Sequence, residues 1–198
     1  MFVTFEGVDW SGKSTQAERL TVWLREQGRT VLATREPGGT VVGEAVRQVV
    51  LHGHDMTPWA EAALYAAARA DHVEQAIRPA LDRGEDVVCD RYLDSSVAYQ
   101  GVARGLGEDK VLELNLTVTR GLLPDRTFLM LLDPEEALSR GGDEPDRIER
   151  EGGDFMRRVD AAYRSLAAVS PTRIIALDGA RPAEEIAEEV REHIRELL

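Results

Sequence analysis

The chain has 198 residues, with 36 acidic and 24 basic side chains and a formal net charge of −12. A surface that binds long nucleic acid is normally electropositive, so this balance argues against a nucleic-acid partner. No apolar run approaches the roughly 20 residues that span a bilayer, and we expect neither a signal peptide nor a membrane. The single cysteine, Cys89, permits no intrachain disulfide. We therefore expect one cytoplasmic domain over residues 1–198.

A phosphate-binding loop is predicted close to the N-terminus. Residues 7–14 read Gly-Val-Asp-Trp-Ser-Gly-Lys-Ser and fit the pattern Gly-x-x-x-x-Gly-Lys-[Ser/Thr]. Glycines allow backbone N–H groups to approach an anion, Lys13 would reach the β- and γ-phosphates, and the Ser14 hydroxyl would hold Mg²⁺. A β-rich run at 2–5 precedes the loop and a helical pattern at 16–24 follows it. The residues expected to bind the triphosphate are Gly7, Val8, Asp9, Trp10, Ser11, Gly12, Lys13, Ser14 and Thr15.

Apolar runs alternate with helical patterns along the chain. The runs cover residues 2–5, 30–33, 86–89, 127–132 and 174–177. This alternation predicts a five-stranded parallel sheet with helices on both faces, the three-layer α/β architecture of the P-loop NTPase fold. Ligands of such sheets bind at the carboxyl ends of the strands. Arg35 and Arg91 follow the second and third runs and are therefore expected at the site.

Residues 58–82 have the pattern of a long helix with two different faces. Tyr65, Arg69 and His72 share one face, which is either an exposed polar flank or part of a site. Pro79 is expected to kink or end the helix. The face expected to pack against the core carries Trp59, Ala63, Ala66, Ala70, Val73 and Ile77.

Periodicity is lost between residues 139 and 154. This stretch contains glycines, a proline and mixed charge, and it carries Arg140, Arg147 and Arg150. It is either a plain surface loop or, in a protein that transfers phosphate, a mobile lid.

Three classes of protein could use such a phosphate loop. A GTP-dependent switch usually reads guanine through an Asn-Lys-x-Asp segment, and the sequence has none. An ATPase motor usually needs more domain than 198 residues provide. A small-molecule kinase needs a second anion site, which Arg35 and Arg91 could supply because guanidinium groups bind phosphate oxygens bidentately. The kinase is the favoured interpretation, and the switch is its rival from another class.

Five motifs resemble the signatures of bacterial thymidylate kinases, a family of P-loop nucleoside monophosphate kinases. They occur in the family's order and spacing, and the resemblance covers essentially the whole chain. The motifs are Phe-Glu-Gly-Val-Asp at 5–9, Thr-Arg-Glu-Pro-Gly-Gly at 34–39, Asp-Arg-Tyr at 90–92, Ser-Ser-Val-Ala-Tyr-Gln-Gly at 95–101 and Asp-Arg-Ile-Glu at 146–149.

The resemblance implies transfer of a phosphoryl group from ATP to deoxythymidine monophosphate (dTMP), with Mg²⁺. It implies that Arg35 and Arg91 hold the monophosphate and that Asp9 accepts a hydrogen bond from the sugar 3′-OH. Tyr65 would stack on the pyrimidine. Arg69 would donate to O4 of the base, where cytosine carries an amine donor instead.

Further substrate contacts follow from the same resemblance. Ser96 and Gln100 would lie at the base or its surroundings, and Pro37 belongs to the same set. Tyr99 would crowd the sugar C2′ and disfavour ribonucleotides. The family also implies a homodimer. The alternatives left open are a kinase for another nucleoside monophosphate and, less favoured, a nucleotide-binding switch.

The implied mechanism needs no general base, because the attacking phosphate oxygen is already anionic near neutral pH. Catalysis would consist of alignment and of charge neutralisation by Lys13, by Mg²⁺ held through Ser14 and by lid arginines. Arg91 and Asp9 are also expected among the catalytic residues. Because the phosphate loop contains no arginine, further charge is expected from the lid. Arg140 is favoured for the transferring phosphoryl group, and Arg147 for the ATP side or for lid closure.

Two carboxylates keep open roles. Asp90 would either act with Ser14 in holding Mg²⁺ or orient Arg91. Glu6 would either buttress the phosphate loop or have a further role at the site.

Overall fold

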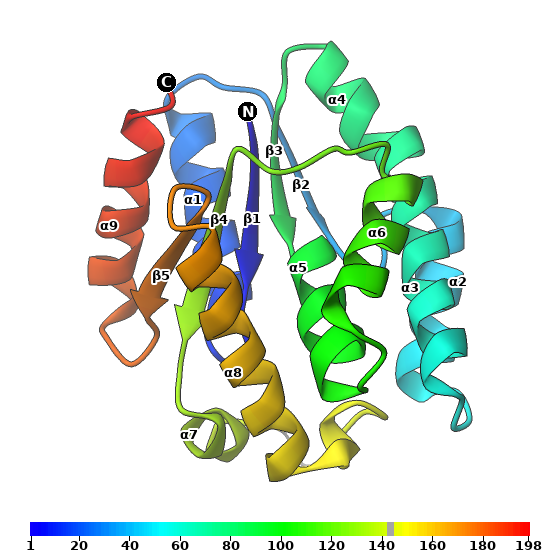
Figure 1. The fold of residues 1–198 in the computed structure, drawn as a ribbon. Coiled ribbons are helices and arrows are strands. Elements are labelled where there is room, and N and C mark those ends of the chain that lie inside the picture. The colour runs from blue at the N-terminus through cyan, green and yellow to red at the C-terminus, as the bar shows by residue number, and fades with distance from the viewer. Residues whose placement is uncertain (142–144) are drawn as a thin grey trace.

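The computed structural model describes residues 1–141 and 145–198. Its sheet has five parallel strands in the order β2-β3-β1-β4-β5, which confirms the predicted architecture (Figure 1). The strands are β1 (Phe2–Glu6), β2 (Val31–Arg35), β3 (Asp86–Asp90), β4 (Arg126–Leu131) and β5 (Ile174–Asp178).

Helices cover both faces of the sheet (Figure 1). They are α1 (Lys13–Glu26), α2 (Val41–His52), α3 (Pro58–His72), α4 (Arg78–Asp82), α5 (Leu93–Ser96), α6 (Glu108–Val118), α7 (Pro134–Ser139), α8 (Gly153–Val169) and α9 (Ala183–Arg195). Two π-helical segments, η1 (Val73–Ile77) and η2 (Val97–Ala103), and one 3₁₀ turn, η3 (Glu149–Glu151), complete the described elements.

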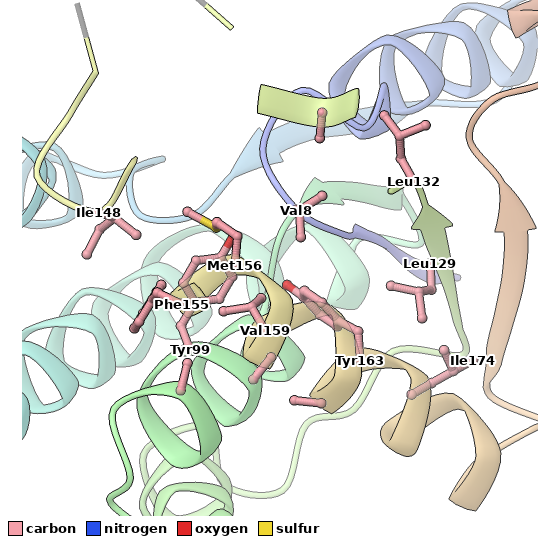
Figure 2. Close-up of a cluster of buried hydrophobic side chains, with 14 residues drawn as sticks. Val8, Tyr99, Leu129, Leu132, Ile148, Phe155, Met156, Val159, Tyr163 and Ile174 are labelled. Atoms are coloured by element: carbon pink, nitrogen blue, oxygen red, sulfur yellow. The ribbon is translucent and has the colours of Figure 1, made fainter. Parts of the chain in front are cut away.

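The central strand β1 is buried along its whole length, as expected for a parallel sheet covered on both faces. Val3 and Phe5 face α1 and α9, and Phe5 stacks on Phe128 with ring centroids 5.3 Å apart. Phe2 points to the opposite face, where it meets the Tyr92 ring. A third cluster lies between η2, α8 and β4 (Figure 2). Because Val8 belongs to this cluster, the core itself holds the phosphate loop in place.

The predicted core face of the long helix is only partly correct. Trp59 is 48% exposed and Ala63 is exposed, whereas Ala66, Val73 and Ile77 are buried as expected. The buried face of α3 carries charged residues beside its alanines, with Glu61 and Arg69 1% and 2% exposed. The apolar pattern missed this face because charged side chains are buried only when they are paired, and pairing is decided by distant segments.

The helix does not stop at Pro79. It runs from α3 through the π-helical segment η1 into α4, which ends at Asp82. Pro79 follows the π-helical segment closely, and such wider turns are a common place for a helix to accommodate an irregularity. The wider π turn also shifts the phase of the side chains, so one straight stripe cannot run the full length.

The predicted lid segment begins after α7 and reaches into α8. Residues 142–144 of this segment lie outside the described part of the chain. Arg147 N donates to Leu51 O at 2.9 Å, which attaches the following turn to the end of α2. Across residues 1–141 and 145–198, no helix has both the length and the apolar character needed to cross a membrane.

Candidate nucleotide site

The phosphate loop joins the carboxyl end of β1 to the first turn of α1, as predicted. Gly7 has φ 140°, and a Cβ there would lie 2.6 Å from Met130 O, so only glycine fits this close approach. Gly12, with φ 92°, caps α1 without a side-chain hydrogen bond. The free N–H groups of the first turn are therefore available to an anion. The buried Ser11 hydroxyl also has no partner among the described residues.

Lys13 lies inside the loop rather than on its surface. Its ammonium donates to Val8 O and to Asp9 Oδ1, both at 3.3 Å, and the side chain is almost fully buried. Burial and the nearby Arg91 lower the pKa of Lys13, and the carboxylates of Asp9 and Asp90 only partly oppose this. The loop thus holds a desolvated cation, which interacts more strongly with phosphate than a solvated one would.

Ser14 and Asp90 meet at the end of β3. The Ser14 hydroxyl donates to Asp90 Oδ2, and Asp90 Oδ1 is buried without a hydrogen-bond partner in the described structure. Within that same part of the chain, no group of three or more His, Cys, Asp or Glu residues could hold a metal. Mg²⁺ in phosphate-transfer sites typically needs only one or two carboxylates plus substrate phosphates. A hydroxyl beside a carboxylate with a free oxygen fits that requirement.

Arg91 connects the loop to the rest of the site. It follows β3 with φ 68°, a left-handed conformation held by the bond from Arg91 N to Phe5 O at 2.8 Å. Its Nη2 donates to Asp9 Oδ1 at 2.6 Å, and its Nη1 donates to Gly7 O at 2.9 Å. Burial alone would raise the pKa of Asp9, but Arg91 and Lys13 lower it below the usual range. Asp9 therefore carries a negative charge shared by two cations.

A cavity of about 100 Å³ opens beside Arg91 at the carboxyl edge of the sheet. Its walls include eight of the residues predicted to bind the substrate: Asp9, Pro37, Tyr65, Arg69, Arg91, Ser96, Tyr99 and Gln100. Tyr99 packs against Arg91, whose guanidinium carbon lies 5.3 Å from the ring centroid. Segments far apart in sequence therefore converge on one cavity.

Arg35 is the predicted substrate residue that does not line this cavity. Its exposed side chain donates to Glu44 at 3.0 Å and 3.1 Å on α2. Arg47, which the sequence analysis did not single out, lines the cavity and donates to Pro37 O at 3.0 Å. Arg47 lies on the amphipathic helix α2, where the sequence pattern does not distinguish it from an ordinary surface arginine. Ser95 and Asp146 also line the cavity, and both lie inside the quoted motifs.

The Arg69 side chain is buried and hydrogen-bonded to several residues, so the alternative of an exposed polar face does not hold for it. Its Nε donates to Glu36 Oε2 at 2.6 Å, and its Nη2 donates to Tyr92 O at 3.0 Å. Its Nη1 donates to Ser96 Oγ at 2.8 Å and to Asn115 Oδ1. Because nearly all of its N–H groups are used within the protein, little freedom remains in its position. The guanidinium forms a rigid wall of the cavity.

Glu6 is a buried carboxylate that accepts hydrogen bonds from residues next to the cavity. Its Oε1 accepts Tyr92 N at 2.7 Å, and its Oε2 accepts the Ser95 and Tyr163 hydroxyls at 2.5 Å and 2.8 Å. Burial, followed by the charge of Asp94, raises the pKa of Glu6 to about 7. The Ser95 hydroxyl also accepts from Arg91 Nη1 at 3.1 Å, so Glu6 reaches Arg91 through one intermediate. Glu6 belongs to the motif at 5–9, but its buried partners lie 86 or more residues away and no local pattern indicates them.

The two predicted lid arginines have different environments. Arg140 is exposed and pairs with Glu136 one helical turn earlier, at 2.6 Å. Arg147 is almost fully buried; its Nη2 lies 2.7 Å from Glu61 Oε2, and its Nε donates to Val50 O at 2.8 Å. Arg147 is thus held against α2 and α3 in this structure, whereas Arg140 is on the surface.

A phosphate loop at the end of β1, next to a cationic cavity at the same sheet edge, defines a P-loop phosphotransferase. The family model for thymidylate kinase matches residues 5–190. The chain is 53% identical to a thymidylate kinase of Leifsonia xyli subsp. xyli over 96% of this chain and 92% of that protein. It is 48% identical to one of Bifidobacterium longum subsp. infantis, over 100% of this chain and 87% of that protein.

A solved structure agrees with the sequence comparisons. The crystal structure of thymidylate kinase from Ehrlichia chaffeensis superposes with a TM-score of 0.81 at 31% identity, and the match covers 98% of each chain. The chain belongs to the thymidylate kinase family.

Proposed function

We propose that this protein transfers the γ-phosphoryl group of ATP to dTMP, giving dTDP and ADP. Membership of the thymidylate kinase family supports this reaction. The structural observation that carries it is the position of Asp9, which contacts both the loop lysine and the cavity arginine. The two phosphate-binding cations are thereby joined through a single carboxylate.

The acceptor phosphate would replace Asp9 as the partner of Arg91. A phosphate oxygen is already anionic near neutral pH, with a second pKa of about 6, so no group has to remove a proton before the attack. Arg91 would orient that oxygen toward the γ-phosphorus, where the new P–O bond forms as the bond to the ADP oxygen breaks. Asp9, released from Arg91, would accept the hydrogen bond of the sugar 3′-OH.

The donor phosphates would bind at the first turn of α1, with Lys13 neutralising charge on the β- and γ-phosphates. Ser14 and Asp90 would hold Mg²⁺ there, which when bound would neutralise charge on the phosphate oxygens. Asp90 can take this role because its Oδ1 has no partner within the described residues.

Arg140 is the better candidate for charge on the transferring group. Its only described partner is an exposed i,i+4 pair with Glu136, which is worth little and is easily broken. Arg147 would first have to leave a buried pair with Glu61, so it is assigned to anchoring the lid segment. Arg140→Ala should lower kcat by at least tenfold with little change in dTMP affinity. A larger loss of kcat in Arg147→Ala would reverse this assignment.

We also propose that two copies pair through α2 and α3 in the cytoplasm. Val42 and Val49 of α2 and Trp59 of α3 are 47%, 47% and 48% exposed, although all three are apolar. The helices α2 and α3 pack against each other, and exposed apolar side chains on adjacent elements are typical of protein interfaces. Sedimentation should give a dimer for the wild type and a monomer for Trp59→Glu. A monomeric wild type at micromolar concentration would refute this pairing.

The reaction is tested by following ADP release with ATP, Mg²⁺ and a panel of nucleoside monophosphates. We expect dTMP to give a far higher kcat/KM than dCMP, UMP or AMP. Equal rates with another monophosphate would indicate a different acceptor. Failure of every monophosphate to stimulate ATP turnover would favour the nucleotide-binding switch.

A further inference from the structure

Glu61 is a buried carboxylate that the proposed mechanism does not use. It lies in the first turn of α3, is 1% exposed and does not line the substrate cavity. Both of its oxygens are fully occupied. Oε1 accepts Gln100 Nε2 at 2.9 Å and Arg104 Nε at 3.2 Å. Oε2 accepts Arg104 Nη2 at 3.0 Å and lies 2.7 Å from Arg147 Nη2.

These contacts determine the chemical state of Glu61. Burial opposes its ionisation, but the hydrogen bonds of Arg104 and Gln100 and the contact with Arg147 lower the pKa of Glu61 below its usual value. An ionised carboxylate can only accept hydrogen bonds. The side-chain amide of Gln100 must therefore direct its NH₂ group toward Glu61, since the opposite orientation would place two acceptor oxygens together.

The amide oxygen of Gln100 is then directed away from Glu61. Gln100 lines the cavity, and its Oε1 has no hydrogen-bond partner in residues 1–141 and 145–198. An amide oxygen without a partner in the cavity wall can accept a hydrogen bond from a base whose ring carries an N–H donor. Thymine has such a donor at N3, whereas cytosine has an acceptor lone pair there.

We infer that Glu61 is a positioning residue for base selection: it locks the Gln100 amide so that an acceptor faces N3 of the pyrimidine. This inference rests on the proposed function and extends it to a residue outside the cavity. Glu61 also connects this lock to the lid segment, because Arg104 Nη1 donates to Glu151 Oε1 at 2.5 Å and Arg147 belongs to the same segment. The Glu61 carboxylate therefore contacts both the residue proposed to recognise the base, Gln100, and an arginine of the lid segment, Arg147.

The test compares dTMP with 5-methyl-dCMP, which differs from dTMP only at ring positions 3 and 4. In Glu61→Gln the new amide can donate or accept, so the Gln100 amide is free to rotate. We expect the ratio of kcat/KM for dTMP over 5-methyl-dCMP to fall by about tenfold, the effect of about one hydrogen bond. The ratio should stay above one because Arg69 still disfavours the 4-amino group. Equal loss with both nucleotides, leaving the ratio unchanged, would overturn the inference.

Two further variants make the test specific. Asp86→Asn is a matched control, because Asp86 is also 1% exposed and is paired with an arginine, Arg29. Asp86 lies at the amino end of β3, the end of the sheet opposite the cavity. The kcat/KM ratio of this variant should equal that of the wild type. In a Gln100→Ala background, Glu61→Gln should change the ratio by less than about twofold. An equal tenfold change without Gln100 would show that Glu61 acts by another route.

Thermal unfolding of each variant establishes that it is folded. If Glu61→Gln does not fold, Glu61→Asp keeps the charge but shortens the side chain by one methylene, and it should also lower the ratio. An unchanged ratio in folded Glu61→Asp would then overturn the inference. A wild type that does not phosphorylate dTMP would refute the proposed function itself, which is a separate result.

Discussion

The donor and acceptor halves of the site are built in different ways. On the proposed donor side, Ser14 and Arg140 are exposed, and the free N–H groups of a helix end are available to an anion. On the acceptor side, Arg69 and Gln100 are 2% exposed and held by other buried side chains. Phosphate needs only positive charge at the right distance, whereas a base edge must be matched by fixed donors and acceptors. Base selection therefore depends on buried side chains whose donors and acceptors are fixed, whereas the donor side combines one buried cation, Lys13, with exposed groups.

Removing the loop lysine should have the largest effect. Lys13→Ala deletes the desolvated cation expected at the β- and γ-phosphates, and we expect kcat to fall by about 10³-fold with every acceptor. Because Lys13 does not line the acceptor cavity and Asp9 keeps Arg91 as a partner, dTMP binding measured by calorimetry should change little. A loss confined to dTMP, with other acceptors unaffected, would contradict this division of roles.

The stability of the two halves should also differ. Arg69→Met leaves Glu36 buried without its main partner and should lower the free energy of unfolding by about 3 kcal/mol. Arg140→Met is the matched control on the donor side and should change it by less than about 0.5 kcal/mol. Urea denaturation of both variants provides the measurement. Equal losses of unfolding free energy in the two variants would contradict the difference between the acceptor side and the donor side.

Glu6 should make the stability of the acceptor side depend on pH. Its folded pKa of about 7 is higher than the value of 4.5 expected when unfolded. Between these values the folded state binds more protons, so this group's contribution to stability decreases as pH rises. From pH 5 to pH 8 the wild type should lose about 2 kcal/mol relative to Glu6→Gln in urea denaturation. A parallel pH dependence in the two proteins would show that Glu6 does not titrate in this range.

The smallest effect is expected where the donor loop touches the lid segment. Trp10 Nε1 donates to Glu149 Oε1 at 2.9 Å, and Trp10 is 45% exposed. Trp10→Phe removes this solvent-exposed bond but keeps an aromatic ring, so KM for ATP should change by about twofold or less. A tenfold change would mean that this contact is as important as the buried ones.

Much of the fold could be predicted from residue patterns. The five strands lie within two residues of the expected positions, and the phosphate loop has the expected neighbours. Eight of the nine predicted substrate residues line one cavity because strand ends in a parallel sheet meet at the same edge. The roles assigned to those residues remain predictions. The position of Arg35 outside the cavity and of Arg47 within it depends on how α2 packs, which local pattern does not specify.

The sequence by itself determined the elements that depend on near neighbours: the Gly-rich loop, the strand and helix beside it, and the motifs that indicate the family. Tertiary structure alone decided which charges are buried and with which partners. Gln100 and Arg147 lie 39 or more residues from Glu61 along the chain, yet both contact its carboxylate. A buried charge is stable only when its partners are in place, so its role can be read only where distant segments meet.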